Sequence, residues 1–228
     1  MEAKADRIGL ADILTIVLVT GSLWGFTEVV LDSAVRTAGL PFRSGILTGI
    51  GIGLLAVALG ALRRPATLVL LPLIAILVKQ LVVPILHVSV MCAANSCLAV
   101  MMGGLAVSGV VYAVGRRLDR NRLVQAASGA SGALLAAGAF YFAGMRLAPC
   151  KYLLSFNSPA GFVRFMLVEG LVWAAVSAAL FPVGYRVGSQ VRDTVLAQKQ
   201  RSWLYYAASA AVVVGSWAAS AVVIAAGL

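Results

Sequence analysis

The residues of this chain that could do chemistry lie inside long apolar segments. Glu28 follows Trp24 by one helical turn, Lys79 stands beside Gln80, and Glu169 lies in FMLVEGLVW. Charges at such positions are costly, so they usually face a watery cavity or a protein interior and often serve function. Counted along helices that rise 1.5 Å per residue, the three charges share a depth of roughly 7–12 Å below one membrane surface. They are predicted to line one cavity open to that side, with Trp24 as an apolar or cation–π wall.

A structural ion pair is the alternative to a cavity, because a buried pair can simply fix the register of two helices. A relay of carboxylates for protons is disfavoured, since all three charges sit in one half of the membrane and leave no path across. Two carboxylates and one lysine suit a cation or a zwitterion as the ligand.

A second group of chemically distinctive residues lies in the stretch HVSVMCAANSC. Cys92 and Cys97 could bind a soft metal, but on an unbroken helix residues five apart are turned by roughly 140° and face apart. Three interpretations stay open: a disulfide from either of them to Cys150, three free thiols, or a metal site. His87 and Asn95 are predicted to give directional contacts to an organic ligand near the cavity mouth.

Composition predicts a membrane protein, because only 11% of the 228 residues are charged and 61% are hydrophobic, whereas a soluble domain carries roughly 25% charged residues. Seven apolar runs reach the ~20 residues that span a bilayer: 10–34, 44–62, 66–86, 90–115, 123–145, 163–185 and 204–227. The predicted fold is an all-α polytopic helical bundle. We divide it into a six-helix transmembrane core (1–186), a basic cytoplasmic connector (187–203) and an additional transmembrane helix (204–228).

The net charge of +10 is explained by topology. If the N-terminus is cytoplasmic, most of the Lys and Arg residues fall in inner segments, as cytoplasmic loops require. This distribution predicts a multi-pass protein of the bacterial plasma (inner) membrane, with its C-terminus outside if all seven runs span. The basic loops are expected to contact anionic membrane lipid and not nucleic acid.

Span two carries a ridge of small residues, because Gly45, Gly49 and Gly53 are four apart. Such a ridge lets another backbone approach closely. It predicts either helix packing within the chain or the docking of a partner subunit.

Residues 20–85 contain four short motifs of a known family: WG-x-x-E (Trp24, Gly25, Glu28), a Pro-Phe and Gly-rich start of span two (Pro41, Phe42, Gly45), Arg64-Pro65, and Lys79 late in span three. This part of the chain resembles the N-terminal half of substrate-binding (S) components of energy-coupling factor (ECF) transporters. The resemblance implies a compact six-helix protein that captures a vitamin or metal ion from outside. It also implies partners, namely a coupling membrane subunit and two cytoplasmic ATPases. A seventh span is not expected of that family.

The sequence therefore predicts a transport protein that binds a small solute in an outer-facing cavity through Trp24, Glu28, Lys79, Gln80, His87, Asn95 and Glu169. It contains no Walker A motif, so we expect neither ATP hydrolysis by this chain nor a cofactor. Two rival functions remain: a membrane thiol-disulfide oxidoreductase that uses Cys92, Cys97 and Cys150, and a non-catalytic subunit of a larger membrane complex.

Overall fold

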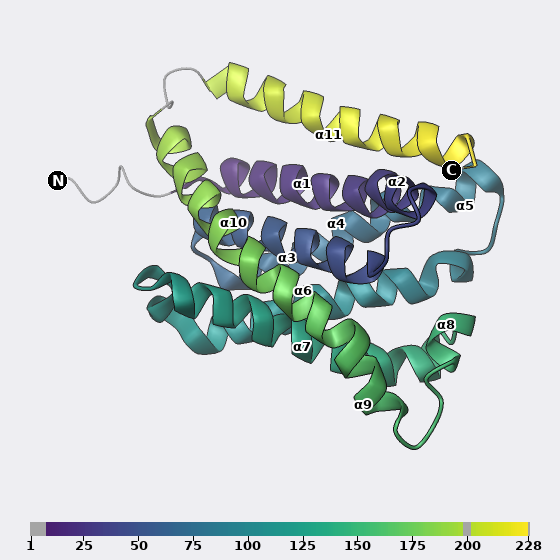
Figure 1. The fold of residues 1–228 in the computed structure, drawn as a ribbon. Helices are drawn as coiled ribbons and strands as arrows, with labels where there is room; N and C mark the ends of the chain where they lie inside the picture. Colours follow the sequence, from purple (N-terminus) through teal and green to yellow (C-terminus); the bar gives the residue numbers. More distant parts are fainter. Residues whose placement is uncertain (1–7, 198–201, 228) are drawn as a thin grey trace.

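A computed structural model describes residues 8–197 and 202–227, which form helices and their connections with no β-strand between them (Figure 1). Within these ranges seven helices are long and apolar enough to cross a membrane: Leu10–Thr37, Arg43–Leu62, Pro65–Leu86, Ala94–Asp119, Arg122–Leu147, Gly161–Leu196 and Trp203–Ala225. The predicted all-α helical bundle is confirmed, and its seven long apolar helices indicate a membrane protein.

Several of these spans consist of more than one helical segment. The first contains α1 (Leu10–Phe26), the π-helical turn η1 (Thr27–Leu31) and α2 (Asp32–Thr37), and the second is α3 (Arg43–Leu62). The third contains η2 (Pro65–Val69), α4 (Leu70–Lys79) and α5 (Val82–Leu86). The fourth contains α6 (Ala94–Val114), with the 3₁₀ turns η3 (Val90–Ala93) before it and η4 (Gly115–Asp119) at its end.

The fifth span is α7 (Arg122–Leu147), which is followed by the short helix α8 (Lys151–Leu154). The sixth contains α9 (Gly161–Phe165), the π-helical turn η5 (Met166–Gly170) and α10 (Leu171–Ala197), and the seventh is α11 (Ser202–Ala225).

The glycine ridge of α3 packs within the chain. Its three glycines each lie against one side chain of α10: Gly45 on Val172, Gly49 on Val176 and Gly53 on Leu180. A Cβ atom at Gly49 would come within 2.2 Å of a Val176 methyl carbon, so only glycine permits this approach. Helix α10 contributes glycines of its own, because a Cβ at Gly188 would meet the Val57 carbonyl oxygen at 2.0 Å. The ridge is thus filled by α10, which favours the packing interpretation over a docking site.

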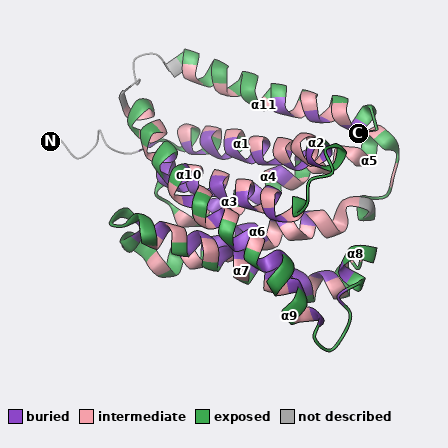
Figure 2. Ribbon diagram, viewed as in Figure 1, coloured by how far each residue is buried: buried purple, intermediate pink, exposed green. Residues whose placement is uncertain are grey.

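Helix α1 lies between α4 and α11. Its Gly21 and Gly25 face Ile74 and Val78 of α4. On the α11 side, the Trp217 indole N–H donates to Ser22 Oγ at 2.9 Å. Figure 1 shows α11 alongside α1 at the edge of the bundle, and much of its surface is exposed or only partly buried (Figure 2). An apolar helix that buries so little surface against protein is suited to face lipid on its other side.

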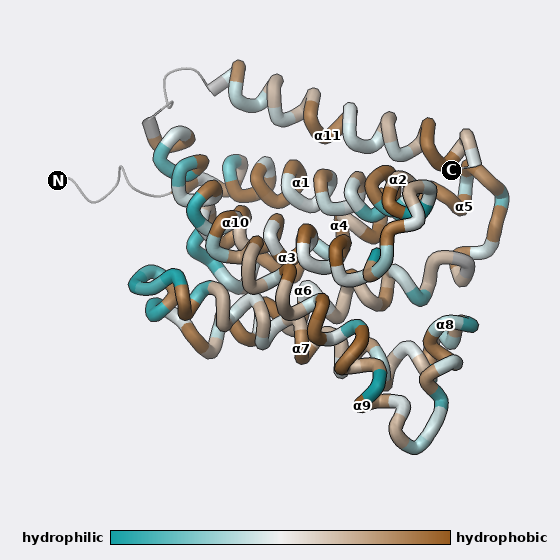
Figure 3. Tube along the Cα trace, viewed as in Figure 1, coloured by the Kyte–Doolittle hydropathy of each residue, from teal (hydrophilic) through white to brown (hydrophobic). Residues whose placement is uncertain are grey.

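The two ends of the bundle carry the polar residues, and the middle is apolar (Figure 3). At one end, which we call the basic end, Arg63 pairs with Asp119 at 3.1 Å and the Tyr185 hydroxyl donates to the same carboxylate. The basic residues Lys4, Arg7, Lys199 and Arg201 lie outside the described residues. Which end faces the cytoplasm stays a prediction from charge.

Two predicted boundaries differ from the structure. Residues 187–197 of the proposed connector continue helix α10, because Val191 and Leu196 still pack on the apolar core; residues 198–201 lie outside the described part. The fourth span, predicted from residue 90, begins with 3₁₀ geometry and becomes α-helical only at Ala94. The angle of roughly 140° between Cys92 and Cys97 holds only for a regular α-helix, and residues 92–97 do not form one.

Candidate ligand-binding cavity

A cavity of about 880 Å³ opens at the end of the bundle where α2 ends and α3 begins. Six charged side chains from several helices line it: Glu28, Asp32, Arg36, Arg43, Lys79 and Glu169. The three charges predicted to share a depth, which come from spans one, three and six, thus reach the same cavity. Trp24, the predicted apolar wall, also lines it and is 2% exposed.

Glu28 and Lys79 form a buried ion pair between η1 and α4. Lys79 Nζ donates to Glu28 Oε2 at 2.6 Å, and the two side chains are only 13% and 8% exposed. Gly21 and Gly25 bring α1 and α4 close enough for this contact. The pair joins two helical segments and also lines the cavity. An ion pair between helices and a place in a cavity wall are therefore not exclusive for Lys79.

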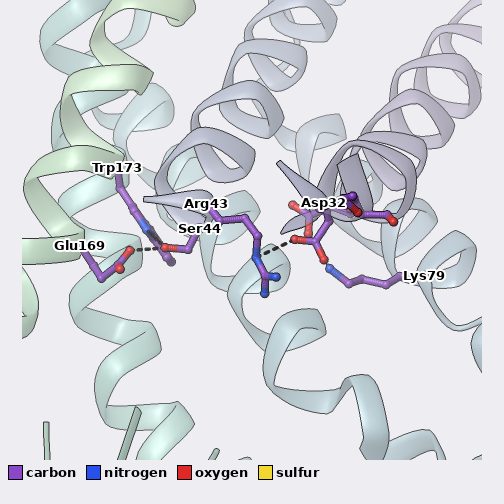
Figure 4. A network of polar contacts seen from close by, with 9 residues as sticks. Asp32, Arg43, Ser44, Lys79, Glu169 and Trp173 are labelled. Carbon is purple, nitrogen blue, oxygen red and sulfur yellow. Dashed lines mark hydrogen bonds and ion pairs between the residues drawn. The ribbon is translucent and has the colours of Figure 1, made fainter. Parts of the chain in front are cut away.

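Glu169 accepts hydrogen bonds from neutral hydroxyl groups. The Ser44 hydroxyl donates to Oε2 (Figure 4). The Tyr152 hydroxyl donates to Oε1. The Trp173 indole N–H donates to Ser44 Oγ at 3.1 Å. Because an indole nitrogen can only donate, Ser44 keeps its own proton for Glu169. Both carboxylate oxygens are therefore held by donors, and no described basic side chain lies within ion-pair distance of Glu169.

Tyr152 remains a donor over a wide pH range. Partial burial, together with the hydrogen bond to Glu169 and its charge, raises the pKa of the Tyr152 phenol above its ordinary value of 10. The raised pKa favours the protonated phenol, so its hydrogen bond to Glu169 persists at neutral pH.

Asp32 and Arg43 form a more exposed ion pair at the cavity. Arg43 Nε lies 3.0 Å from Asp32 Oδ1, and the side chains are 46% and 26% exposed for arginine and aspartate (Figure 4). This pair joins α2 to the start of α3 across the connection between spans one and two. Solvent reaches it, so its contribution to stability is small.

Both cavity glutamates lie in π-helical turns, a feature that the sequence did not predict. Glu28 lies in η1 and Glu169 in η5, while most of the remaining first and sixth spans is α-helical. A π turn adds a residue to a helical turn and re-aims the side chains around it, and such turns are frequent at functional sites. Two of them beside one cavity indicate that its acids are placed at some cost to helix regularity.

Asn95 lines the cavity, as predicted, and contacts one of the thiols. Its side-chain amide donates to Cys150 Sγ at 3.0 Å, while its Oδ1 is buried without a hydrogen-bond partner among the described residues. Cys150 is half-buried and free, and Cys97 is buried and free. The side chain of Cys92 lies outside the described residues. No disulfide joins Cys97 to Cys150 in this structure.

His87 and Gln80 are not among the residues that line the cavity. His87 is an exposed residue at the end of α5, where it adopts a positive φ of 50°. Gln80 donates to Cys97 Sγ at 3.4 Å and so contacts the start of α6. No group of three or more His, Cys, Asp and Glu residues that could hold a metal ion occurs in the described part of the chain.

Ser44, Tyr152 and Trp173 belong to the cavity but were not predicted. Trp173 follows Glu169 by four residues, the same spacing that drew attention to Trp24 and Glu28, so a sequence signal existed. Ser44 and Tyr152 carried none, because their contacts with Glu169 span 125 and 17 residues of sequence.

No family model, curated protein or solved structure matches this chain. The fold and cavity define it as a helical membrane protein with a charged hollow at one end of the bundle.

Proposed function

We propose that this chain is a membrane transport protein that binds a small organic solute in the cavity. The observation that carries the proposal is that Glu28, Lys79 and Glu169, from three spans, all line one cavity. Charges in membrane spans are retained at a free-energy cost, and their usual role is to serve a solute or ion. A volume of about 880 Å³ falls within the range of small-molecule sites.

An organic solute is favoured over a metal ion. The described residues offer no cluster of metal ligands. Trp24 and Trp173, each 2% exposed, instead give the cavity aromatic walls. Flat apolar walls with a few fixed polar groups are typical of sites for organic molecules.

Orientation and energy supply complete the proposal. The basic end is proposed to face the cytoplasm of a bacterium, in accord with the positive-inside rule, so that the cavity opens outward for uptake. The resemblance to ECF S components suggests a coupling membrane subunit and ATPases as partners. Helix α11 would be an addition to that six-helix plan.

Binding of a solute in the cavity is best tested with a variant whose side chain fills the cavity. Gly103 of α6 lines the cavity, and a Cβ there would meet no heavy atom within 4 Å, so Gly103→Leu extends into free space. Gly109, on the same helix, is exposed, also has room for a Cβ and does not line the cavity, which makes Gly109→Leu the matched control.

The full chain and both variants are purified in mild detergent, and the small molecules they release are identified by mass spectrometry. We expect one solute in the wild type and in Gly109→Leu, and its loss from Gly103→Leu. Native mass spectrometry of the same samples detects ATPase partners. Absence of any released solute from the wild type, or equal amounts in all three proteins, would contradict the proposal.

A further inference from the structure

The charges around the cavity are unevenly compensated. Glu28 with Lys79 and Asp32 with Arg43 form two pairs that cancel their own charge. Glu169 is 6% exposed and has only neutral hydroxyl donors among the described residues. A buried carboxylate without a cation is costly, so this wall of the cavity carries a negative charge that remains to be compensated.

The remaining charged residue of the cavity wall, Arg36, does not compensate Glu169. It lies on the exposed surface of α2, without an ion-pair partner among the described residues. Water and salt screen an exposed charge, so Arg36 offsets little of the charge on the buried carboxylate. The negative charge of Glu169 therefore dominates its own side of the cavity.

Three aromatic rings line the same cavity as this carboxylate. Phe165, Glu169 and Trp173 are spaced four residues apart along the sixth span, and Phe140 of α7 stacks on Trp173 with ring centroids 5.9 Å apart. Phe140 also lies 6.3 Å from the Phe165 ring. All three rings are at most 7% exposed and line the cavity. Aromatic faces attract cations, and more strongly where water is excluded.

We propose that Glu169 and these rings, together the Glu169 subsite, bind a positively charged nitrogen group of an organic solute. The carboxylate supplies the counter-charge and the rings supply an apolar, cation-attracting wall. The hydrogen bonds from Ser44 and Tyr152 fix the carboxylate before the solute arrives, which lowers the entropic cost of binding. This inference rests on the proposed function, since it names the class of solute that the cavity takes.

A purely structural role is the alternative for Glu169, since its hydrogen bonds join α3, α8 and the sixth span. The two roles differ in one measurable property. A structural carboxylate affects folding but does not distinguish a charged ligand from a neutral one. A binding carboxylate makes the cavity select for positive charge.

Matched probes measure that selection. Choline carries a trimethylammonium group, 3,3-dimethylbutan-1-ol replaces its nitrogen with carbon and is neutral, and 3,3-dimethylbutanoate is an anion of similar shape. Binding of each to the full chain in nanodiscs is measured by equilibrium dialysis, with empty nanodiscs as the blank. We expect choline to bind at least about tenfold more tightly than the neutral alcohol, which corresponds to about 1.4 kcal/mol, and the anion to bind most weakly.

The preference for choline is then followed in variants. Glu169→Gln is expected to abolish it, and Glu169→Asp to retain part of it. Asp119→Asn, which removes an acid at the basic end, should leave it unchanged. If Glu169→Gln does not fold, as judged by its melting temperature, Phe140→Leu gives a second test, with the preference expected to fall about threefold through the loss of one aromatic face.

The outcomes separate this inference from the proposed function. Equal binding of choline and its neutral isostere to the wild type, or a preference that survives Glu169→Gln, overturns the Glu169 subsite. The transport proposal stands in that case if a neutral or anionic solute is released by the wild type and lost in Gly103→Leu. Both proposals fail if no probe binds and no solute is released.

Discussion

The Glu28–Lys79 pair leads to a quantitative prediction for stability. Lys79→Met keeps the length and apolar stem of the side chain but removes its charge, and so leaves the 8% exposed Glu28 side chain without a cation. At 2.6 Å and an effective dielectric constant of about 20, the lost attraction is roughly 6 kcal/mol. Part of it is offset because Lys79 no longer has to be desolvated. Removal of one partner from a buried pair costs about 3–5 kcal/mol, and we expect Lys79→Met to fall in that range.

Removal of both charges should lower the free energy of unfolding by less than removal of one. In Glu28→Gln/Lys79→Met no ion is left buried, so the desolvation penalty of both groups disappears with their attraction. We expect the double variant to be more stable than either single variant, with a coupling energy of at least about 2 kcal/mol. The free energy of unfolding is measured for the full chain and the three variants by titration with SDS in mixed micelles, followed by circular dichroism.

The second ion pair of the cavity is the control. Arg43→Met removes one partner of the Asp32–Arg43 pair, in which Arg43 is 46% and Asp32 26% exposed, so the expected cost is only about 0–1 kcal/mol. The reasoning is refuted if Lys79→Met costs no more than Arg43→Met, or if the double variant loses the sum of the two single losses. Either result would mean that Glu28 and Lys79 are solvated independently.

Two further predictions concern packing and topology. Gly49→Val should destabilise the protein by about 1–3 kcal/mol through overpacking against α10. Gly109→Val on the open face of α6 should change stability by less than about 1 kcal/mol, because a Cβ there meets no heavy atom within 4 Å and valine forms helices better than glycine; equal losses would argue against close α3–α10 packing. In a background without native cysteines, Ser158→Cys should react with a membrane-impermeant maleimide on intact cells and Arg120→Cys only after lysis; the reverse pattern would invert the proposed orientation.

The helical spans were predictable because their signal is local. Seven apolar runs of about 20 residues are hard to place anywhere but in long helices, and the described residues form seven long apolar helices at those positions. The glycine ridge of α3 could also be recognised, though only the structure shows that α10 fills it. The sequence did not indicate where the sixth span ends, because Val191 and Leu196 continue its apolar pattern beyond residue 186.

Hydrogen-bond partners between distant segments could not be predicted. The hydroxyls of Ser44 and Tyr152 reach Glu169 only because α3 and α8 pack near η5 in the fold. For His87, proximity in sequence to a cavity residue predicted a place in the cavity that the fold does not give it. It stands eight residues from Asn95, yet the end of α5 leaves it exposed and outside the cavity wall.

Depth and direction of a charge differ in how well a sequence determines them. The depth of Glu28, Lys79 and Glu169 follows from the rise per residue alone, and it placed all three at one cavity. Direction depends on the rotation of each helix, which changes by about 100° for every residue and is altered again by a π turn. Because η1 and η5 surround the two acids, a regular helical wheel misplaces both carboxylates. In a chain with so few charges, a shared depth is therefore the stronger guide to a common site.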